Sequence, residues 1–284
     1  ARCMQSDEVL NFTPHPNKGL ASASFAGNSQ SIISTNNNGE YALWDGHAKL
    51  ASGSFSNSSK FPSELGRFLN EQQHAVTLSH PYWLSETEVT KEQFKAVTTQ
   101  KLNNEKNGSL PMVCNWFDAQ KFCSQLNQLQ KPPNGYTWRL PTEAEWEHAC
   151  RSDSTGPFCN SQIAQLQNNE TKLEEHLSKY GWFEKNSKGK INPVKQKLPN
   201  SFGLYDMHGN VWEWCLDSTR KTKAMLLKQR ISGIINPYSS NGDWRILRGG
   251  CYDLKFDRCR SAYRGANAPS VVNGDRGFRI ALSL

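Results

Sequence analysis

The chain has 284 residues, of which 36% are hydrophobic and 21% are charged. That length is enough for one large domain, or for one domain with a short extension, and the composition excludes a disordered protein. No apolar run approaches the roughly 20 residues of a membrane helix, so we expect no membrane-spanning segment. The formal net charge is +7, but the lysines and arginines are scattered, so we expect no nucleic-acid partner.

The first 45 residues are rich in Ser, Asn and Ala and predict short strands within 20–25, 31–34 and 38–45. The last of these segments ends in Trp-Asp and looks like the tail of one WD-type β-propeller repeat. A propeller needs several repeats, and no second copy follows. A β meander packed on the main domain is the alternative that we favour. We therefore expect a β-rich extension at 1–45 and a domain at 46–284.

Helix signals follow within that domain. Thr90 to Gln93 forms a capping box, and residues 117–129 carry apolar side chains at helical spacing. Thr142, with Glu three residues later, predicts a further helix start, and residues 161–180 can form another helix. Nine Trp, 20 Gly and 13 Pro indicate an irregular fold with many turns and few long elements.

Long motifs occur in a fixed order along the second part of the chain. They are WRLPTEAEW at 138–146, NSFGLYDMHGNVWEW at 200–214, LRGG at 247–250 and GFR at 277–279, with EVTKEQF at 88–94 as a weaker match. Together they resemble the formylglycine-generating enzyme (sulfatase-modifying factor) family over roughly residues 50–284, and the motif set looks prokaryotic. The resemblance implies an α+β, irregular C-type-lectin-like fold with short strands, few helices and much loop. One fold hosts many functions, so the motifs alone do not assign one.

Two groups of motif residues have an expected role. The turn at 206–214 offers the hard oxygen of Asp206 and several carbonyls, which suit calcium. The resemblance implies one calcium ion held by the Asp206 side chain and by the carbonyls of Met207, Gly209 and Val211. A turn closed by hydrogen bonds alone is the alternative. Three arginines also stand in motif positions, and we expect them to hold the loop-rich core together through carboxylates and carbonyls: Arg139, Arg248 and Arg279.

The residues that carry out the reaction in the family's active enzymes have no counterparts in this sequence. Those enzymes oxidise a substrate cysteine to formylglycine with copper and oxygen, and two close cysteines after the Gly-Gly pair bind Cu(I), a soft ion that prefers thiolates. Here Cys251 follows Gly250 directly, and a shortened segment replaces the usual ligands with Asp253, Leu254, Lys255 and Phe256. We therefore expect neither copper nor formylglycine-generating activity, and Cys251 is the one catalytic candidate.

The eight cysteines contain no C-x-x-C pair, which argues against zinc-ribbon and thioredoxin-like sites. A few disulfides and buried free thiols both fit the sequence. The resemblance implies that Cys150 pairs with Cys259, so a copper site built from Cys251 and Cys259 would require that pair to break. Disulfides would favour a cell-envelope or extracellular location.

The segment 263–276 is rich in small, polar and turn-forming residues. In a C-type-lectin-like fold it lies near the ligand-facing surface. A framework at 260–262, Arg264, Pro269 and 277–279 is interrupted by residues of mixed character. This pattern resembles the variable proteins of diversity-generating retroelements, whose variable positions sit on the binding face. Ordinary drift in a surface loop is the alternative.

The function that we expect is a monomeric binding module for a protein or another surface ligand, with a diversified C-terminal face. The alternative is a copper-dependent oxidoreductase that makes formylglycine from a protein cysteine, or a related oxidase. The candidate ligand-binding residues are Tyr252, Asp253, Leu254, Phe256, Asp257, Tyr263, Gly265, Ala266, Asn267, Ala268, Ser270, Val271, Asn273, Gly274 and Asp275.

Overall fold

The computed structural model describes residues 74–98, 107–132, 135–152, 154–159, 169–220 and 233–284, together with the backbone of six strands among the first 54 residues. These six are β1 (Arg2–Cys3), β2 (Val9–Asn11), β3 (Ser24–Ala26), β4 (Ser31–Thr35), β5 (Glu40–Asp45) and β6 (Ala48–Ser54). The first three extend a sheet of the main domain, and the last three form a separate antiparallel sheet. Because β5 and β6 pair with each other, a hairpin spans the expected boundary at residue 45.

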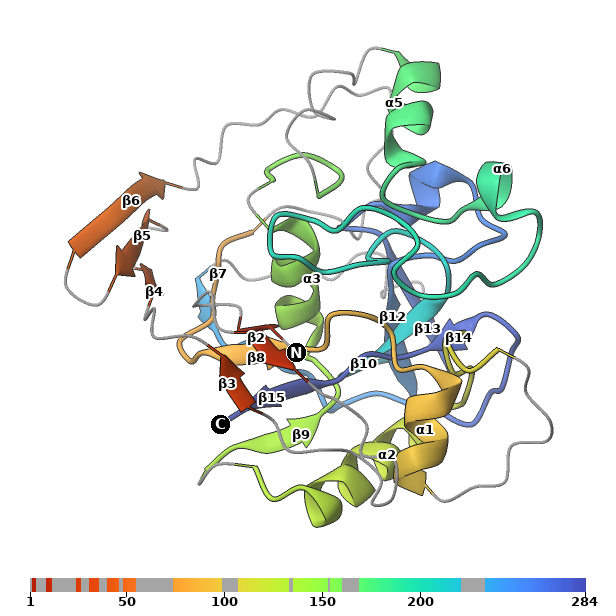
Figure 1. Ribbon diagram of the computed structural model, residues 1–284, viewed down its shortest axis with the longest axis horizontal. Helices are drawn as coiled ribbons and strands as arrows, with labels where there is room; N and C mark the ends of the chain where they lie inside the picture. The colour runs from red at the N-terminus through yellow and green to blue at the C-terminus, as the bar shows by residue number, and fades with distance from the viewer. Residues whose placement is uncertain are drawn as a thin grey trace.

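The larger sheet has the order β3-β2-β1-β8-β15-β9 and joins distant parts of the chain (Figure 1). Its domain strands are β8 (Tyr82–Leu84), β9 (Thr137–Arg139) and β15 (Ala281–Ser283). Leu282 on β15 lies opposite Trp83 on one side and Trp138 on the other. The last strand therefore lies between β8 and β9, which are far apart in the sequence.

A second sheet has the order β13-β12-β10-β14 and carries the remaining motifs. It consists of β10 (Trp212–Thr219), β12 (Trp244–Arg248), β13 (Arg264–Asn267) and β14 (Arg276–Gly277). A short parallel pair, β7 (Val76–Thr77) with β11 (Ile234–Ile235), stands apart from it. The second sheet brings the segment after the Gly-Gly pair beside the loop near the C-terminus.

Helices lie around these sheets. They are α1 (Lys91–Thr98), α2 (Trp116–Leu129), α3 (Glu143–Arg151), α5 (Glu170–Leu177), α6 (Glu184–Ser187) and the 3-10 turn η3 (Phe256–Cys259). Helices α1 and α3 begin at the capping residues that the sequence predicts. Thr142 caps α3, and the Glu145 side chain returns to its amide at 2.8 Å, as predicted. Asn115 caps α2, which starts at Trp116, one residue before the predicted start at 117. Of the helix predicted over 161–180, residues 161–168 lie outside the described part.

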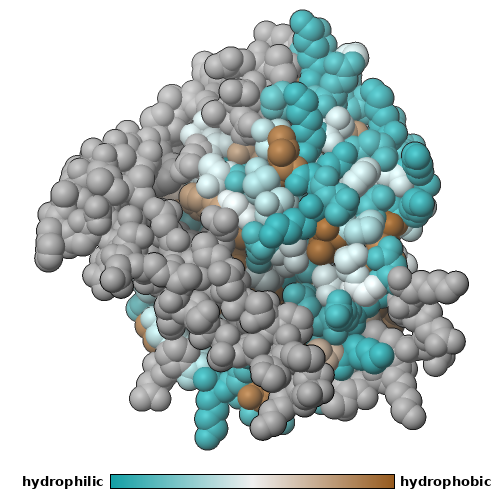
Figure 2. Space-filling model, in the orientation of Figure 1, coloured by the Kyte–Doolittle hydropathy of each residue, from teal (hydrophilic) through white to brown (hydrophobic). Residues whose placement is uncertain are grey.

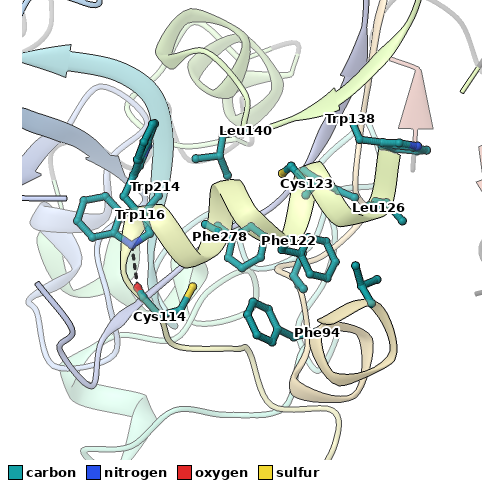
Figure 3. Close-up of a cluster of buried hydrophobic side chains, with 14 of the residues drawn as sticks. Phe94, Cys114, Trp116, Phe122, Cys123, Leu126, Trp138, Leu140, Trp214 and Phe278 are labelled. Atoms are coloured by element: carbon teal, nitrogen blue, oxygen red, sulfur yellow. Dashed lines mark hydrogen bonds between the residues drawn. The ribbon is translucent and has the colours of Figure 1, made fainter. Parts of the chain in front are cut away.

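The main core lies between α1, α2 and the sheets (Figure 3). Phe94, Phe122 and Phe278 meet there with ring centroids 5.3–6.3 Å apart. Trp214 is fully buried, and its indole N–H donates to the carbonyl of Cys114 at 2.9 Å. A buried indole needs such a partner, so the irregular segment before α2 is held against β10. The mixture of short strands, helices and loops confirms the expected fold class.

The described surface in Figure 2 is mostly hydrophilic, with apolar residues in small separate patches. Within the described part of the chain, no helix has both the length and the apolar character needed to cross a bilayer.

Candidate functional site

The three motif arginines bind carboxylates and carbonyls inside the protein. Arg279 is fully buried and donates to both oxygens of Glu213, at 2.6 and 2.7 Å. Arg139 bonds both oxygens of Glu145 at 2.7 Å. Arg248, also fully buried, pairs with a glutamate of α3 and stacks its guanidinium near a tryptophan ring. The structural role expected for these arginines is confirmed.

The turn predicted to bind calcium contains a buried acid with an unused oxygen. Asp206 is 1% exposed and has a φ of 58°, in the left-handed region. Its Oδ2 accepts from the amide of Lys195 at 2.8 Å, and its buried Oδ1 has no hydrogen-bond partner among the described residues. Gly209 follows with a φ of 100°, and a Cβ there would lie 1.8 Å from the carbonyl oxygen of Trp182. The turn is therefore specific for glycine and leaves one carboxylate oxygen unsatisfied.

Two further buried carboxylates, Glu88 and Glu213, interact electrostatically with Asp206. Glu88 is fully buried and accepts from the side-chain amide of Asn210 at 2.8 Å and from the amide of Val211 at 3.1 Å. Burial raises the pKa of Glu88, and the charges of Asp206 and Glu213 raise it further. Burial also raises the pKa of Asp206 to about 6. Arg279 bonds Glu213 and acts on Glu88 and Asp206 through its charge, and Lys197 also acts on Asp206. The three buried carboxylates therefore have few positive charges near them.

The other predicted calcium ligands belong to the same buried turn. Met207 is 2% exposed, and its carbonyl lies 3.7 Å from the thiol of Cys150. Val211 is fully buried. Glu88 opens the weaker motif at 88–94, but it was not predicted to lie at this turn. The sequence signal that could have identified it was an acidic residue inside a family motif.

Cys150 and Cys259, the predicted disulfide partners, are both buried free thiols in the structure. The Cys150 sulfur lies 3.4 Å from the hydroxyl oxygen of Ser261 and 3.9 Å from each ring nitrogen of His208. The Cys259 sulfur instead lies 3.9 Å from the carbonyl of Lys255. His208 also bonds the Cys259 carbonyl at 2.8 Å. The two thiols thus have different partners, with the imidazole in contact with both residues.

The catalytic candidate Cys251 has carboxylates as its neighbours. It is 1% exposed, and its sulfur lies 3.0 Å from Oδ1 of Asp253 and 3.8 Å from Oδ2 of Asp275. Burial raises the pKa of Cys251, and both aspartates raise it further. The thiol is therefore kept protonated, which is unfavourable for a nucleophile or a thiolate ligand in the absence of a cation.

In the C-terminal segment, buried framework residues are interspersed with more exposed residues. Arg260 and Ser261 are 4% and 0% exposed, and Phe278 is fully buried. Arg264 is held by Glu143 through two bonds of 2.5 and 2.7 Å. Most candidate ligand-binding residues lie between these anchors and are exposed or half-buried: Tyr252, Asp253, Leu254, Asp257, Tyr263, Gly265, Ala266, Asn267, Ala268, Ser270, Val271, Asn273, Gly274 and Asp275.

Phe256 is wrong as a candidate contact residue. It is 5% exposed, and its ring packs against Phe158 and Phe183, each at a centroid distance of 6.4 Å. The 3-10 turn η3 directs this ring inward, where its apolar area is removed from water. Gly265 is also constrained, because a Cβ there would lie 3.0 Å from the ring of Trp212.

Two exposed apolar residues near the same segment were missed. Val272 is 61% exposed inside the candidate loop. Phe117 is 54% exposed at the start of α2, and the neighbouring amide of Trp116 bonds the carbonyl of Pro269 at 3.0 Å. That bond places the start of α2 against the C-terminal loop. The contact is long-range, so helical spacing could not identify it.

Comparisons with known proteins agree with the motifs. Residues 39–284 match the family model described as the sulfatase-modifying factor enzyme 1-like domain. The chain is 34% identical over 161 residues to the formylglycine-generating enzyme of Streptomyces coelicolor, an alignment that covers 50% of this chain and 46% of the relative. It is 32% identical over 190 residues to the Mus musculus protein named inactive C-alpha-formylglycine-generating enzyme 2, with 61% and 49% covered. The chain thus spans about half the length of these curated relatives.

Among solved structures, Treponema denticola variable protein 1 is similar, with a TM-score of 0.62 and 28% identity over 80% of this chain and 89% of that chain. The relatives include one protein named as an enzyme and one named as inactive. Similarity of fold alone does not distinguish between these roles. Because the family model covers most of its length, the chain belongs to the sulfatase-modifying factor enzyme 1-like domain family, with an irregular C-type-lectin-like fold.

Proposed function

We propose that the chain is a binding module that presents the more exposed candidate residues of the segments 252–257 and 263–275 to a macromolecular partner. The observation that carries this proposal is the separation between a buried framework and the more exposed residues that interrupt it. Arg264 and Phe278 are anchored inside the protein, while Asp253, Ser270 and Asn273 are exposed. Such a scaffold tolerates changes at its contact positions, because those side chains do not fill the core.

The surroundings of Cys251 favour binding over copper chemistry. The thiol bonds a carboxylate and lies near a second one, whereas Cu(I) prefers paired soft sulfur donors. In the metal-free protein, its raised pKa also makes this thiol a poor nucleophile. The proposal therefore uses the scaffold of the family without its oxidase reaction.

We further propose that the exposed positions are diversified between copies of the gene. The similarity to a solved variable protein motivates this version. A near-identical template repeat and a reverse transcriptase beside the gene are expected, with differences confined to adenine-containing codons at the exposed positions. Sequencing the locus in several isolates tests it. Differences scattered equally over Arg264, Phe278 and the exposed positions would contradict it.

Binding itself is tested by site-specific photo-crosslinking in the cells that make the protein. A photoreactive amino acid at Asn273 should give a discrete crosslinked product. The matched control carries the same amino acid at Leu198, which is 52% exposed and lies outside the proposed face. Equal products at both positions, or none at position 273, would argue against a binding face at the C-terminal segment.

We also propose that calcium stabilises the turn at 206–211, bound by the side chain of Asp206 and by the carbonyls of Met207, Gly209 and Val211. The support is the unsatisfied Oδ1 of Asp206 inside a region with an excess of buried carboxylates. Calcium prefers oxygen ligands of this kind. Its role is structural, because the turn holds β10 and its motif residues in place.

Calcium binding predicts a shift in thermal stability. At free calcium of 100 times the Kd, the folded state gains about 2.7 kcal/mol, which raises Tm. Asp206→Asn should remove that shift, whereas the control Asp243→Asn, at an exposed acid, should keep it. Calorimetry in calcium and in chelator measures both. An unchanged Tm in the original protein, or an equal shift in Asp206→Asn, would rule out this site.

A further inference from the structure

Three side chains that bind metals in other proteins converge beside the C-terminal loop. Cys251 and Asp253 follow the Gly-Gly pair, and Asp275 approaches from the other end of the candidate binding segment. One ligand atom from each lies within 4.8 Å of the other two. In the part of the chain that the structure describes, this is the one such group of three His, Cys, Asp or Glu side chains.

The distances fit a small divalent ion. With a metal–sulfur bond of about 2.3 Å and a metal–oxygen bond of about 2.0 Å, tetrahedral ligands place sulfur and oxygen about 3.5 Å apart. The Cys251 sulfur lies 3.0 Å from Oδ1 of Asp253 and 3.8 Å from Oδ2 of Asp275. The first distance is shorter and the second longer than this tetrahedral sulfur–oxygen distance. Small side-chain rotations are enough to form the tetrahedron.

The electrostatics of the cluster favour a cation. Asp275 directs Oδ2 to the cluster, while its Oδ1 is buried, forms no hydrogen bond and has Arg276 Nη1 at 3.3 Å. Burial and the two carboxylates raise the pKa of Cys251, so the thiol proton now occupies the space between sulfur and oxygen. A bound cation would replace that proton and offset the repulsion among three anions.

We propose that Cys251, Asp253 and Asp275 bind one divalent metal ion of the zinc class, with water in the fourth position. One thiolate with two carboxylates suits zinc better than calcium, which prefers oxygen, or Cu(I), which prefers sulfur. Binding forms the metal–sulfur bond and releases the thiol proton to solvent, without any change in oxidation state.

Such an ion would fasten together the two ends of the proposed binding face. Asp253 lies in the turn after the Gly-Gly pair, and Asp275 lies 24 residues from Cys251 at the end of the loop. Cys251 is buried while Asp253 is exposed, so the site opens to solvent on one side. The metal site does not depend on which partner the face binds.

Cobalt(II) is a suitable probe, because its bond to a thiolate gives a near-ultraviolet charge-transfer band. The full chain, reduced and freed of metal, should take up one equivalent of cobalt with this band, and zinc should displace it. Cys251→Ser should abolish the band. Asp253→Asn and Asp275→Asn should keep the thiol but weaken cobalt binding about tenfold or more, since even outer-shell changes cost that much.

Two controls separate this site from other thiols and from the proposed calcium turn. Cys114→Ser removes another buried thiol and should leave the band unchanged, as should Asp206→Asn. Circular dichroism checks the fold of each variant. The proposal is overturned if the original protein shows no band, if Cys251→Ser retains it, or if both aspartate variants bind cobalt as tightly as the original. The two aspartate variants decide the matter if Cys251→Ser does not fold.

Discussion

At the scale of single residues, a buried ion pair contributes to the stability of this fold. Arg279 and Glu213 are 0% exposed, and the guanidinium also donates to the carbonyls of Ser85 and Tyr205, each at 3.0 Å. Removing one partner of such a pair leaves an uncompensated buried charge, which typically costs about 3–5 kcal/mol. These contacts tie β10 to the loops around it.

Asp217 on β10 is the residue from which a pH dependence is expected. It is 6% exposed and accepts from the amides of Glu143 at 2.7 Å and Ser239 at 3.1 Å. Burial, followed by the charge of Glu143, raises the pKa of Asp217 from 3.8 to about 7. The folded protein thus binds this proton more tightly than the unfolded chain. The resulting stability is complete below the unfolded value and is lost as the pH rises through about 7.

Asp217→Asn should therefore flatten the pH profile of stability. The original protein is expected to lose on the order of 4 kcal/mol from this group between about pH 4 and about pH 7. Urea unfolding across that range measures the free energy of unfolding of both proteins. The exposed control Asp243→Asn should follow the original profile. Parallel profiles for Asp217→Asn and the original protein would show that Asp217 is not the group responsible.

At the scale of elements, β13 combines framework and contact residues within four positions. Arg264 is fixed by α3, and Gly265 lies against the ring of Trp212. Trp212 also packs on Tyr263, with ring centroids 5.8 Å apart. The strand therefore has little freedom at 263–265, and diversity at the proposed face is best accommodated in the loop from 270 to 275.

Gly265→Ala tests this limit. The new methyl group would lie 3.0 Å from the Trp212 ring, so the ring must move, and overpacking of this kind costs about 1–3 kcal/mol. Gly274→Ala is the matched control, because a Cβ there has no atom within 4 Å. The urea midpoint should fall for the first variant and stay nearly constant for the second. Equal midpoints would mean that β13 adapts at no cost.

At the scale of the whole molecule, the scaffold of the family is present while the expected copper ligands are not. The seven cysteines of the described residues are all buried and free. Burial raises the pKa of Cys123 and of Cys150 to about 12, so these thiols are poor nucleophiles at neutral pH. The thiols of the described residues therefore mainly fill the core.

The proposed loss of the oxidase reaction can be tested directly. The purified chain, incubated with Cu(I), oxygen and a cysteine peptide carrying a sulfatase-type motif, should give no aldehyde. Mass spectrometry after hydrazide capture detects formylglycine, and an active formylglycine-generating enzyme serves as the positive control. Aldehyde formation that requires Cys251 would reverse the proposal that this chain is a binding module.

Several features were predictable because they depend on neighbours in the sequence. The capping box at Thr142 and Glu145 joins residues three apart, so the local pattern was sufficient. The motifs that indicate the family are also continuous segments. The arginines were predicted to bind acids, since a buried guanidinium requires a counter-charge, although the sequence did not identify those acids.

The sequence by itself determined the family, the fold class and the helix starts at Thr90 and Thr142. The tertiary structure alone decided that Phe256 points into the core, that Cys150 and Cys259 both contact His208, and that Asp275 reaches Cys251. The physical reason is the separation in the sequence of the residues that interact. Caps and motifs act over a few residues, whereas side chains distant in the sequence meet only when packing and burial of the whole chain bring their strands and loops together.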